Sequence, residues 1–202
     1  MRSVLVKIMS VTALAATAAV VLVAPQAASA ATSMTLKYQL YAQRESWNCG
    51  PFATRMALST VGVNPWTSDI AEVEGTDENG TDSVVNVAHA MNYFLQKNNI
   101  LLTYHVYYPT GGPGLQTRLV GNINQGHGIV VNVVNYQQDV NGITRGYGSG
   151  GHYVAVVGYG RSGGTALIAD PGNGKSYYMD VDNLYRWIGG GARGIAATAA
   201  MA

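Results

Sequence analysis

Residues 48–60 read NCGPFATRMALST, and this stretch decides the fold. Its apolar and small residues recur three and four positions apart, which is the spacing of one face of an α-helix. Asn48 suits the capping position before such a helix, and Pro51 suits its first turn. Gly62 and Pro65 then stop the pattern. We predict a helix that begins at Cys49, with its buried face formed by Cys49, Phe52, Ala53, Met56, Ala57 and Thr60.

Helical patterns dominate the first part of the chain that follows. The predicted helices are residues 68–73, which Gly75 ends, residues 81–97, which Thr81 caps, and residues 115–125. Strand patterns are short in this part of the chain. They cover residues 100–108 and a few alternating positions around Leu36 and Tyr38 within residues 31–46.

The second part of the chain has the composition of β-structure. Segments rich in Val, Ile and Tyr predict strands at residues 129–136, 153–159, 165–170 and 176–181. Pro171 to Gly174 read as the turn that joins the last two strands into a hairpin, and residues 182–187 as a short helix. The Ala-rich tail after Gly194 fits either a last strand or an unstructured end. The order of elements predicts an α+β domain, with N-terminal helices packed against one side of a C-terminal antiparallel sheet.

The first 30 residues have the pattern of a secretory signal peptide. Arg2 and Lys7 precede 16 apolar and small residues, Ile8 to Val23, and Ala28-Ser29-Ala30 has the form of a cleavage site. An uncleaved membrane anchor is the alternative, although a span needs roughly 20 apolar residues. We expect cleavage after Ala30, which leaves residues 31–202 as a single secreted domain outside the membrane.

Charge and composition exclude several functions. Removing Arg2 and Lys7 leaves 10 basic against 11 acidic residues and no basic block, so nothing favours nucleic acid as a partner. The acidic segment 77–82 lacks the alternating ligands and closing Glu of a calcium loop. Gly148 to Gly151 precede a strand, whereas a phosphate or dinucleotide loop opens a helix. We therefore expect neither a metal nor a cofactor.

Cys49 is the one cysteine in the chain, so no disulfide can form within it. A single cysteine in a secreted protein is a nucleophile, a buried inert thiol, or a link to another chain. The predicted position at a helix N-terminus favours the negatively charged thiolate. Gly50 leaves space beside it for a substrate backbone.

A nucleophilic thiol needs a base, a group that orients the base, and donors for an oxyanion. His152 follows two glycines and opens a strand, which would hold it rigidly at a cleft; His127, in a glycine-flanked turn, is its competitor. Asp170 ends the next strand before Pro171 and suits the orienting role, although Asp before Pro-Gly is also common in plain turns. Gln43, six residues before Cys49, is the candidate oxyanion donor.

These motifs resemble those of the C39-like peptidases, a papain-like family. The likeness runs from about Gln43 to Trp187 and rests on four segments: Gln43 to Pro51, Gly80 to Asn92, His152 to Tyr159 and Ala169 to Gly172. The resemblance implies a papain-like fold with Cys49 and His152 facing each other across a cleft, Asp170 as the orienting residue and Gln43 as the oxyanion donor. The best-known members are fused to ABC exporters and cut leader peptides after Gly-Gly. This chain is similar instead to the standalone secreted bacterial branch.

Three functions follow from this reading. The first is an extracellular cysteine peptidase or amidase that acts on a peptide or protein substrate. The second is a transglutaminase-like acyl transferase that passes the same acyl-enzyme to an amine. The third is a non-catalytic binding domain, for which 13 tyrosines and three tryptophans offer contact surface. The sequence does not specify an oligomeric state.

Overall fold

The computed structural model describes residues 32–189 and 199–202. The predicted signal peptide, residues 1–30, lies outside the described residues. The helices are α1 (Cys49–Ser59), α2 (Thr67–Glu74), α3 (Val84–Lys97), α4 (Gly112–Asn124) and α5 (Val181–Trp187). The strands are β1 (Met34–Thr35), β2 (His105–Tyr107), β3 (Ile129–Val133), β4 (Tyr136–Gln138), β5 (Thr144–Gly146), β6 (His152–Gly160), β7 (Thr165–Asp170), β8 (Lys175–Asp180) and β9 (Ala199–Met201). None of these helices has the length and apolar character needed to cross a membrane.

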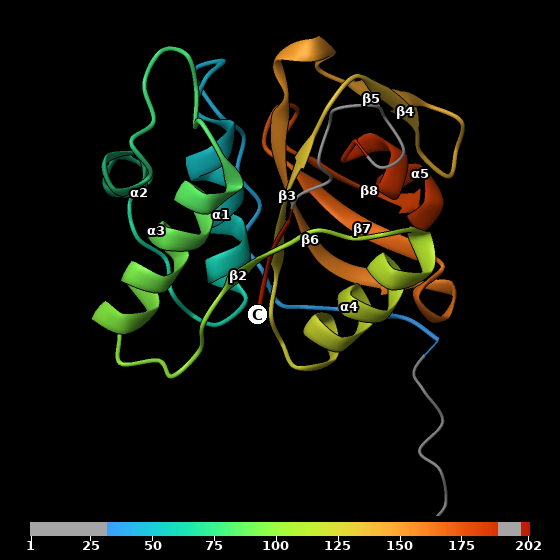
Figure 1. The fold of residues 1–202 in the computed structure, drawn as a ribbon, viewed down its shortest axis with the longest axis horizontal. Helices are drawn as coiled ribbons and strands as arrows, with labels where there is room; N and C mark the ends of the chain where they lie inside the picture. The colour runs from blue at the N-terminus through green and yellow to red at the C-terminus, as the bar shows by residue number, and fades with distance from the viewer. Residues whose placement is uncertain (1–31, 190–198) are drawn as a thin grey trace, which may run out of the picture.

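A seven-stranded antiparallel sheet runs through the middle of the molecule (Figure 1). Its strand order is β2-β9-β3-β6-β7-β8, and β1 pairs with β6. The predicted hairpin is confirmed, because β7 and β8 pair from Thr165–Asp180 to Asp170–Lys175. β3 and β6 pair from Ile129–Val156 to Val133–His152, so the first residue of β6 lies at one end of the sheet.

Helices cover both faces of this sheet, whereas the sequence predicted them on one side. Val130 packs into the cluster that contains α1 and α3, and Val131 packs into the cluster that contains α4 and α5. Successive side chains of a strand point to opposite faces, so the two clusters lie on opposite sides. The prediction that N-terminal helices pack on a C-terminal sheet is confirmed, and the apolar stripes of α4 and α5 bury the other face (Figure 1).

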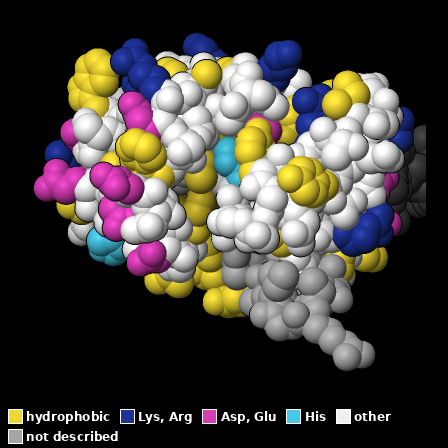
Figure 2. Space-filling view, turned by 90° about the horizontal axis from the view of Figure 1, so that it is seen from above, with side chains coloured by type: hydrophobic (Ala, Val, Ile, Leu, Met, Phe, Trp, Pro, Cys, Tyr) yellow, Lys and Arg dark blue, Asp and Glu magenta, His cyan; other side chains and the backbone are white. Residues whose placement is uncertain are grey.

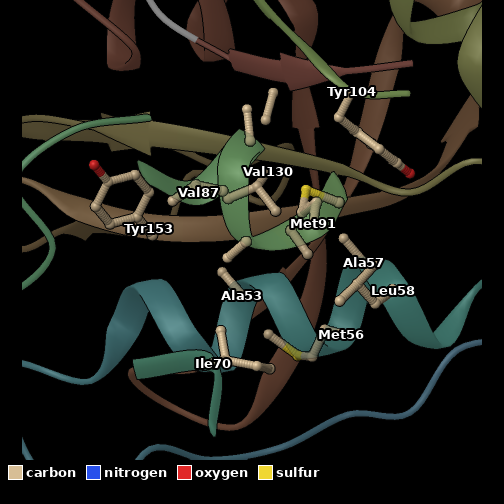
Figure 3. Packing of buried hydrophobic residues seen from close by; sticks show 14 of the residues in the cluster. Ala53, Met56, Ala57, Leu58, Ile70, Val87, Met91, Tyr104, Val130 and Tyr153 are labelled. Carbon is tan, nitrogen blue, oxygen red and sulfur yellow. The ribbon is translucent and has the colours of Figure 1, made fainter. Parts of the chain in front are cut away.

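The packing of α1 between the other helices and the sheet fixes where Cys49 lies. Ala53, Met56 and Ala57 are fully buried; Ala53 and Ala57 face α3 and the sheet, whereas Met56 lies beside Ile70 of α2 (Figure 3). Burying a side chain the size of Met56 contributes about 1.5–3 kcal/mol. On the face shown in Figure 2, acidic side chains gather over the half of the molecule that contains α1, α2 and α3.

Several predicted boundaries are wrong because distant side chains decide them. α3 begins at Val84 after Ser83, and Thr81 does not cap it, because the Thr81 hydroxyl donates to Glu74 (3.1 Å). The predicted strand 100–108 shortens to β2. Asn92 takes both backbone polar groups of Tyr104, with Tyr104 N–H donating to Asn92 Oδ1 (2.7 Å) and Asn92 Nδ2 donating to Tyr104 O (2.9 Å).

The predicted strand 129–136 is two strands with a bend between them. Val134 N–H donates to Trp187 O (2.7 Å), and Asn135, at φ 60°, donates its N–H to Gly148 O (2.8 Å). The chain then forms the β4–β5 hairpin, which the sequence did not predict. Arg145 and Asp139 hold this hairpin together through an ion pair of 2.7 Å. The tail, left open by the sequence, contributes β9, which pairs with both β2 and β3.

Candidate active site

Cys49 is the first residue of α1 and lies at the edge of a cleft of about 230 Å³. Asn48 stands at the N-cap position of α1, as predicted, but its side chain donates to Glu45 Oε2 (2.8 Å) and makes no capping bond. The thiol-bearing residue is only 8% exposed. A methyl group on Gly50 would lie 2.2 Å from the Thr81 hydroxyl, so glycine is required where the loop before α3 crosses the start of α1.

His152 opens β6 and is 3% exposed. Gly151 precedes it at φ +79°, a conformation that glycine adopts without strain. His152 Nε2 donates to Asp170 Oδ1 (2.9 Å). Cys49 lies close enough to the imidazole to raise the pKa of His152, and Nδ1 is the ring nitrogen that the bond to Asp170 leaves free. The structure therefore brings Cys49, His152 and Asp170 together from α1, β6 and β7.

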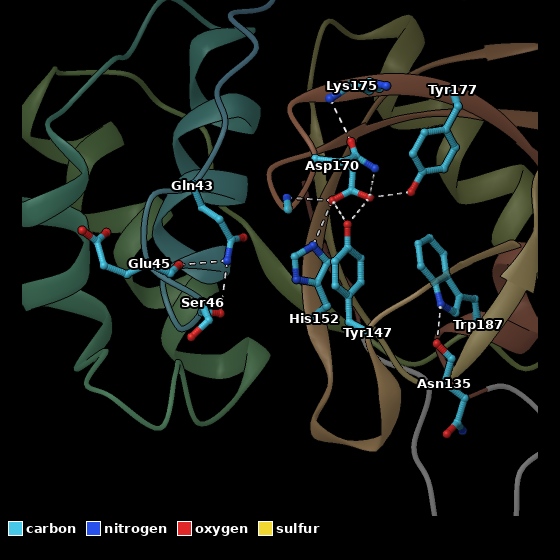
Figure 4. Close-up of polar contacts among 12 residues, drawn as sticks. Gln43, Glu45, Ser46, Asn135, Tyr147, His152, Asp170, Lys175, Tyr177 and Trp187 are labelled. Atoms are coloured by element: carbon cyan, nitrogen blue, oxygen red, sulfur yellow. Dashed lines mark hydrogen bonds and ion pairs between the residues drawn. The ribbon is translucent and has the colours of Figure 1, made fainter.

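Asp170 ends β7, is fully buried, and accepts hydrogen bonds on both carboxylate oxygens (Figure 4). The donors are His152 Nε2 (2.9 Å), the hydroxyls of Tyr147 (2.8 Å to each oxygen) and Tyr177 (2.7 Å), the N–H of Gly172 (2.9 Å) and Asn173 Nδ2 (3.3 Å). So many donors stabilise the ionised form of a carboxylate that burial would otherwise neutralise. Asp170 also has the turn-forming role that the sequence offered as an alternative, because two of its donors, Gly172 and Asn173, belong to the predicted turn.

The pKa directions of the pair follow from these contacts. Burial raises the pKa of Asp170, but the hydrogen bond and positive charge of His152, with the two tyrosine hydroxyls, lower it by more. Burial lowers the pKa of His152, but its hydrogen bonds to Asp170 and Cys49 raise it above the ordinary histidine value. The environment thus favours a protonated imidazolium at His152 beside an ionised carboxylate at Asp170.

Tyr147 and Tyr177 are the site residues that the sequence did not reveal. The Tyr147 ring stacks on the His152 imidazole with 3.6 Å between centroids and 25° between planes. A methyl group on Gly172 would lie 2.5 Å from the Tyr147 hydroxyl, so that glycine makes space for the ring. Tyr147 follows β5 in a glycine-rich segment, and no local sequence pattern marks it as a neighbour of residues 152 and 170.

Gln43 lies in the loop before Cys49, as predicted, but its amide faces the backbone. Nε2 donates to Glu45 O (2.9 Å) and Ser46 O (3.1 Å), which engages both N–H groups (Figure 4). Its Oε1 is buried without a hydrogen-bond partner. The role of oxyanion donor stays a prediction, and it requires one of these two bonds to open. The N–H of Cys49 has no partner within α1, because the first turn of a helix leaves its donors free.

His127, the competing histidine, lies at the opposite end of α1. Its neighbour Gly128 donates its N–H to Thr60 Oγ1 (2.9 Å), just beyond the last residue of the helix. Burial lowers the pKa of His127, and its Nδ1 is buried without a partner. Since Cys49 begins the same helix, His127 cannot reach it.

Among residues 32–189 and 199–202, no three His, Cys, Asp or Glu side chains gather as a metal site would require. The acidic segment 77–82 is a tight turn, in which the N–H of Asn79 donates to Asp77 Oδ1 (2.7 Å).

Comparisons with known proteins agree on the family. The Peptidase_C39 like family matches residues 35–192. A putative C39-like peptidase from Bacillus anthracis has a similar structure, with a TM-score of 0.57, 12% identity, and coverage of 84% of this chain and 98% of that one. A double glycine motif protease from the AMS/PCAT transporter, in complex with the leader peptide, is also similar, with a TM-score of 0.53 and 15% identity. The match covers 83% of this chain and 92% of that one. At these identities the likeness establishes the fold. A comparison with curated proteins gives no match.

Proposed function

The chain belongs to the peptidase C39-like family, and from that premise we propose that it is a secreted cysteine peptidase or amidase. Cys49 is the nucleophile, His152 the acid and base, and Asp170 the residue that orients the imidazole. The observation that carries the proposal is that Cys49 lies beside the His152 imidazole, which in turn donates to the buried carboxylate of Asp170 (2.9 Å).

The reaction follows from the charges of these three groups. The Cys49 thiolate attacks the substrate carbonyl carbon, and the Cys49 N–H faces the developing oxyanion. His152 gives its proton to the leaving nitrogen as the C–N bond breaks, which leaves a thioester on Cys49. Water then attacks the thioester and gives its proton to His152. The carboxylate product leaves, and the thiolate–imidazolium pair is restored.

Asp170 keeps the imidazole in one orientation throughout this cycle. Its bond to Nε2 leaves Nδ1 toward the thiol, so the proton moves on the substrate side of the ring. Tyr147 covers the hydrogen-bonded His152 and Asp170 side chains. Its ring stacks on the imidazole, and its hydroxyl donates to the carboxylate. The ring limits water around the His152–Asp170 bond.

Peptide cleavage by the purified protein tests this function. The parent, Cys49→Ala and His152→Ala are incubated with a mixture of peptides under reducing conditions, because a reactive thiolate oxidises. His89→Ala is the matched control, since His89 is exposed on α3 away from the site. We expect no cleavage by Cys49→Ala, a loss of about 10²–10⁴-fold in His152→Ala, and full activity in the control.

Product masses decide between the outcomes. Cleavage by Cys49→Ala at the parent's rate excludes the proposal. Ligated products at high amine concentration indicate acyl transfer through the same thioester.

The secretion part of the proposal is supported by the pattern of residues 1–30, and an exported protein whose N-terminus is not Ala31 contradicts the assigned cleavage site.

A further inference from the structure

The cleft beside Cys49 has a wall made by the loop between α2 and α3. Glu78 and Asp82 line the same cleft as the thiol, and both are exposed. Neither carboxylate forms a hydrogen bond or ion pair with any residue that the structure describes. No Lys or Arg lines the cleft. Two uncompensated negative charges therefore face the space that a substrate would occupy.

The fold holds this loop in place independently of the two carboxylates. Asp77 and Gly80 exchange backbone hydrogen bonds of 3.0 and 3.3 Å across the turn. Thr81, between the turn and Asp82, donates its hydroxyl to buried Glu74 (3.1 Å) and accepts at its carbonyl from Tyr153 OH (3.3 Å). Glu78 and Asp82 are thus carried by backbone that is anchored on both sides.

An independent feature of the cleft also calls for a hydrogen-bond donor. Asn132, in β3, lines the cleft with Cys49 and Asp82, and its Oδ1 is buried with no partner. A buried acceptor without a donor is costly, so such groups mark places where a ligand binds. Asn132 is the register partner of Tyr153 in the sheet, and both residues line the cleft together with Glu78 and Asp82 of the acidic loop. The carboxylates of Glu78 and Asp82 and the Oδ1 of Asn132 therefore all present hydrogen-bond acceptors at this cleft.

The electrostatic field at the base of the cleft has the same sign. Burial raises the pKa of the Tyr153 phenol, and the charges of Glu74, Cys49 and Asp82 raise it further. Tyr153 and Asp82 both line the cleft, so the carboxylate that raises the pKa of Tyr153 also lies beside the space for a substrate. Figure 2 shows the wider setting, in which acidic side chains gather on the helical half of this face.

We infer that this cleft selects a substrate that carries a Lys or Arg side chain beside the bond that Cys49 attacks. Glu78 and Asp82 attract the cation, and Asn132 accepts a hydrogen bond from its end or from the adjacent backbone. The inference rests on the proposed function for the reaction, but the charge preference of the cleft is measurable without turnover.

Three peptidyl chloromethyl ketones that differ only in Lys, Gln or Glu at the last residue are the probes. The Cys49 thiolate displaces chloride from each one and forms a thioether, so the label reports binding in the cleft. Cys49 is the only cysteine, which makes intact mass a direct readout. At low salt we expect labelling to be about tenfold faster with Lys than with Gln, since each exposed carboxylate contributes a few-fold, and slowest with Glu.

The double variant Glu78→Gln, Asp82→Asn should bring the Lys-to-Gln ratio close to one, and Glu72→Gln should leave it unchanged. Glu72 is an exposed acid on α2 outside the cleft, which makes it the matched control. Added salt should lower the ratio in the parent, because it screens exposed charges.

The outcomes separate this inference from the proposed function. Equal labelling by Lys and Gln probes, or a ratio that survives the double variant, overturns the inference even if peptides are cleaved. A large Lys-to-Gln ratio in a protein that cleaves no peptide supports the cation-selecting cleft and rejects the peptidase. Failure of all three probes to label Cys49 contradicts both.

Discussion

Glu74 is a carboxyl group buried under the cleft, and we expect Glu74→Gln to remove a pH-dependent loss of stability. The side chain is fully buried at the end of α2. It accepts from the hydroxyls of Thr54 in α1 and of Thr76 and Thr81 in the loop. Tyr153, from β6, is the titratable group that senses its charge. A glutamine keeps the shape, accepts through its oxygen, and donates through its nitrogen to hydroxyl oxygens.

The size of the effect follows from the pKa of Glu74. Burial raises it from 4.5 to about 7, against the opposing hydrogen bonds from Thr54, Thr81 and Thr76. At about 1.36 kcal/mol for each pH unit, the difference is worth about 3 kcal/mol. Below pH 4.5 both folded and unfolded chains carry the proton, so this stability is fully present. Between pH 4.5 and 7 the unfolded chain ionises first, and stability falls as the pH rises.

Urea unfolding of the parent and of Glu74→Gln at pH 4, 5, 6, 7 and 8 tests this reasoning. The stability of the variant relative to the parent should increase by about 3 kcal/mol from pH 4 to pH 8. Other titrating groups, such as His152 and Asp170, contribute equally to the pH dependence of unfolding in both proteins. Their contributions therefore cancel when the two free energies of unfolding are subtracted. Glu72→Gln, two residues away and exposed, should show no such trend. A relative stability that does not change with pH would refute the buried, proton-binding role of Glu74.

Three further predictions concern the site and its packing. Iodoacetamide should modify Cys49 at pH 6 at least about tenfold faster in the parent than in His152→Ala, and equal rates measured by mass would contradict the pairing. Tyr147→Phe keeps the ring on the imidazole but loses the hydroxyl bond to the carboxylate, so kcat/KM should fall about tenfold, as for loss of a charged hydrogen bond; an unchanged value would make that bond incidental. Gly50→Ala should lower the free energy of unfolding by about 1–3 kcal/mol through its clash with a threonine hydroxyl. Gly121→Ala, in open space within α4, should be neutral or raise it by up to about 1 kcal/mol; equal losses in the two variants would rule out the clash.

Local patterns predicted most of the fold, because the forces that set them are local. The helix at 49–59 follows from residues three and four positions apart, and Gly75 ends α2 with the left-handed conformation that its sequence allows. The boundaries that were wrong depend on bonds to distant residues. Thr81 suits a helix cap in isolation, but Glu74 takes its hydroxyl.

The candidate site divides in the same way. His152 and Asp170 stand at strand ends beside glycine-containing turns, so the sequence marks them, and antiparallel pairing brings them together. Tyr147 depends on the β4–β5 hairpin and on a stack between residues five positions apart in an irregular segment, which no periodicity predicts. The amide of Gln43 turns toward carbonyls of its own loop, a choice among rotamers that residue type alone does not determine.

β9 is the last described element along the chain, yet it lies inside the sheet between β2 and β3. Val106 and Val130 both have Ala200 as a register partner, so the two strands meet only through a segment made much later. During synthesis and refolding, both strands therefore keep an open edge until that segment docks. Pairings so distant in sequence slow folding, and open edges recruit other chains. Association between such open edges depends on protein concentration. The yield of native protein should therefore fall as the concentration during refolding rises, and dilution should restore it.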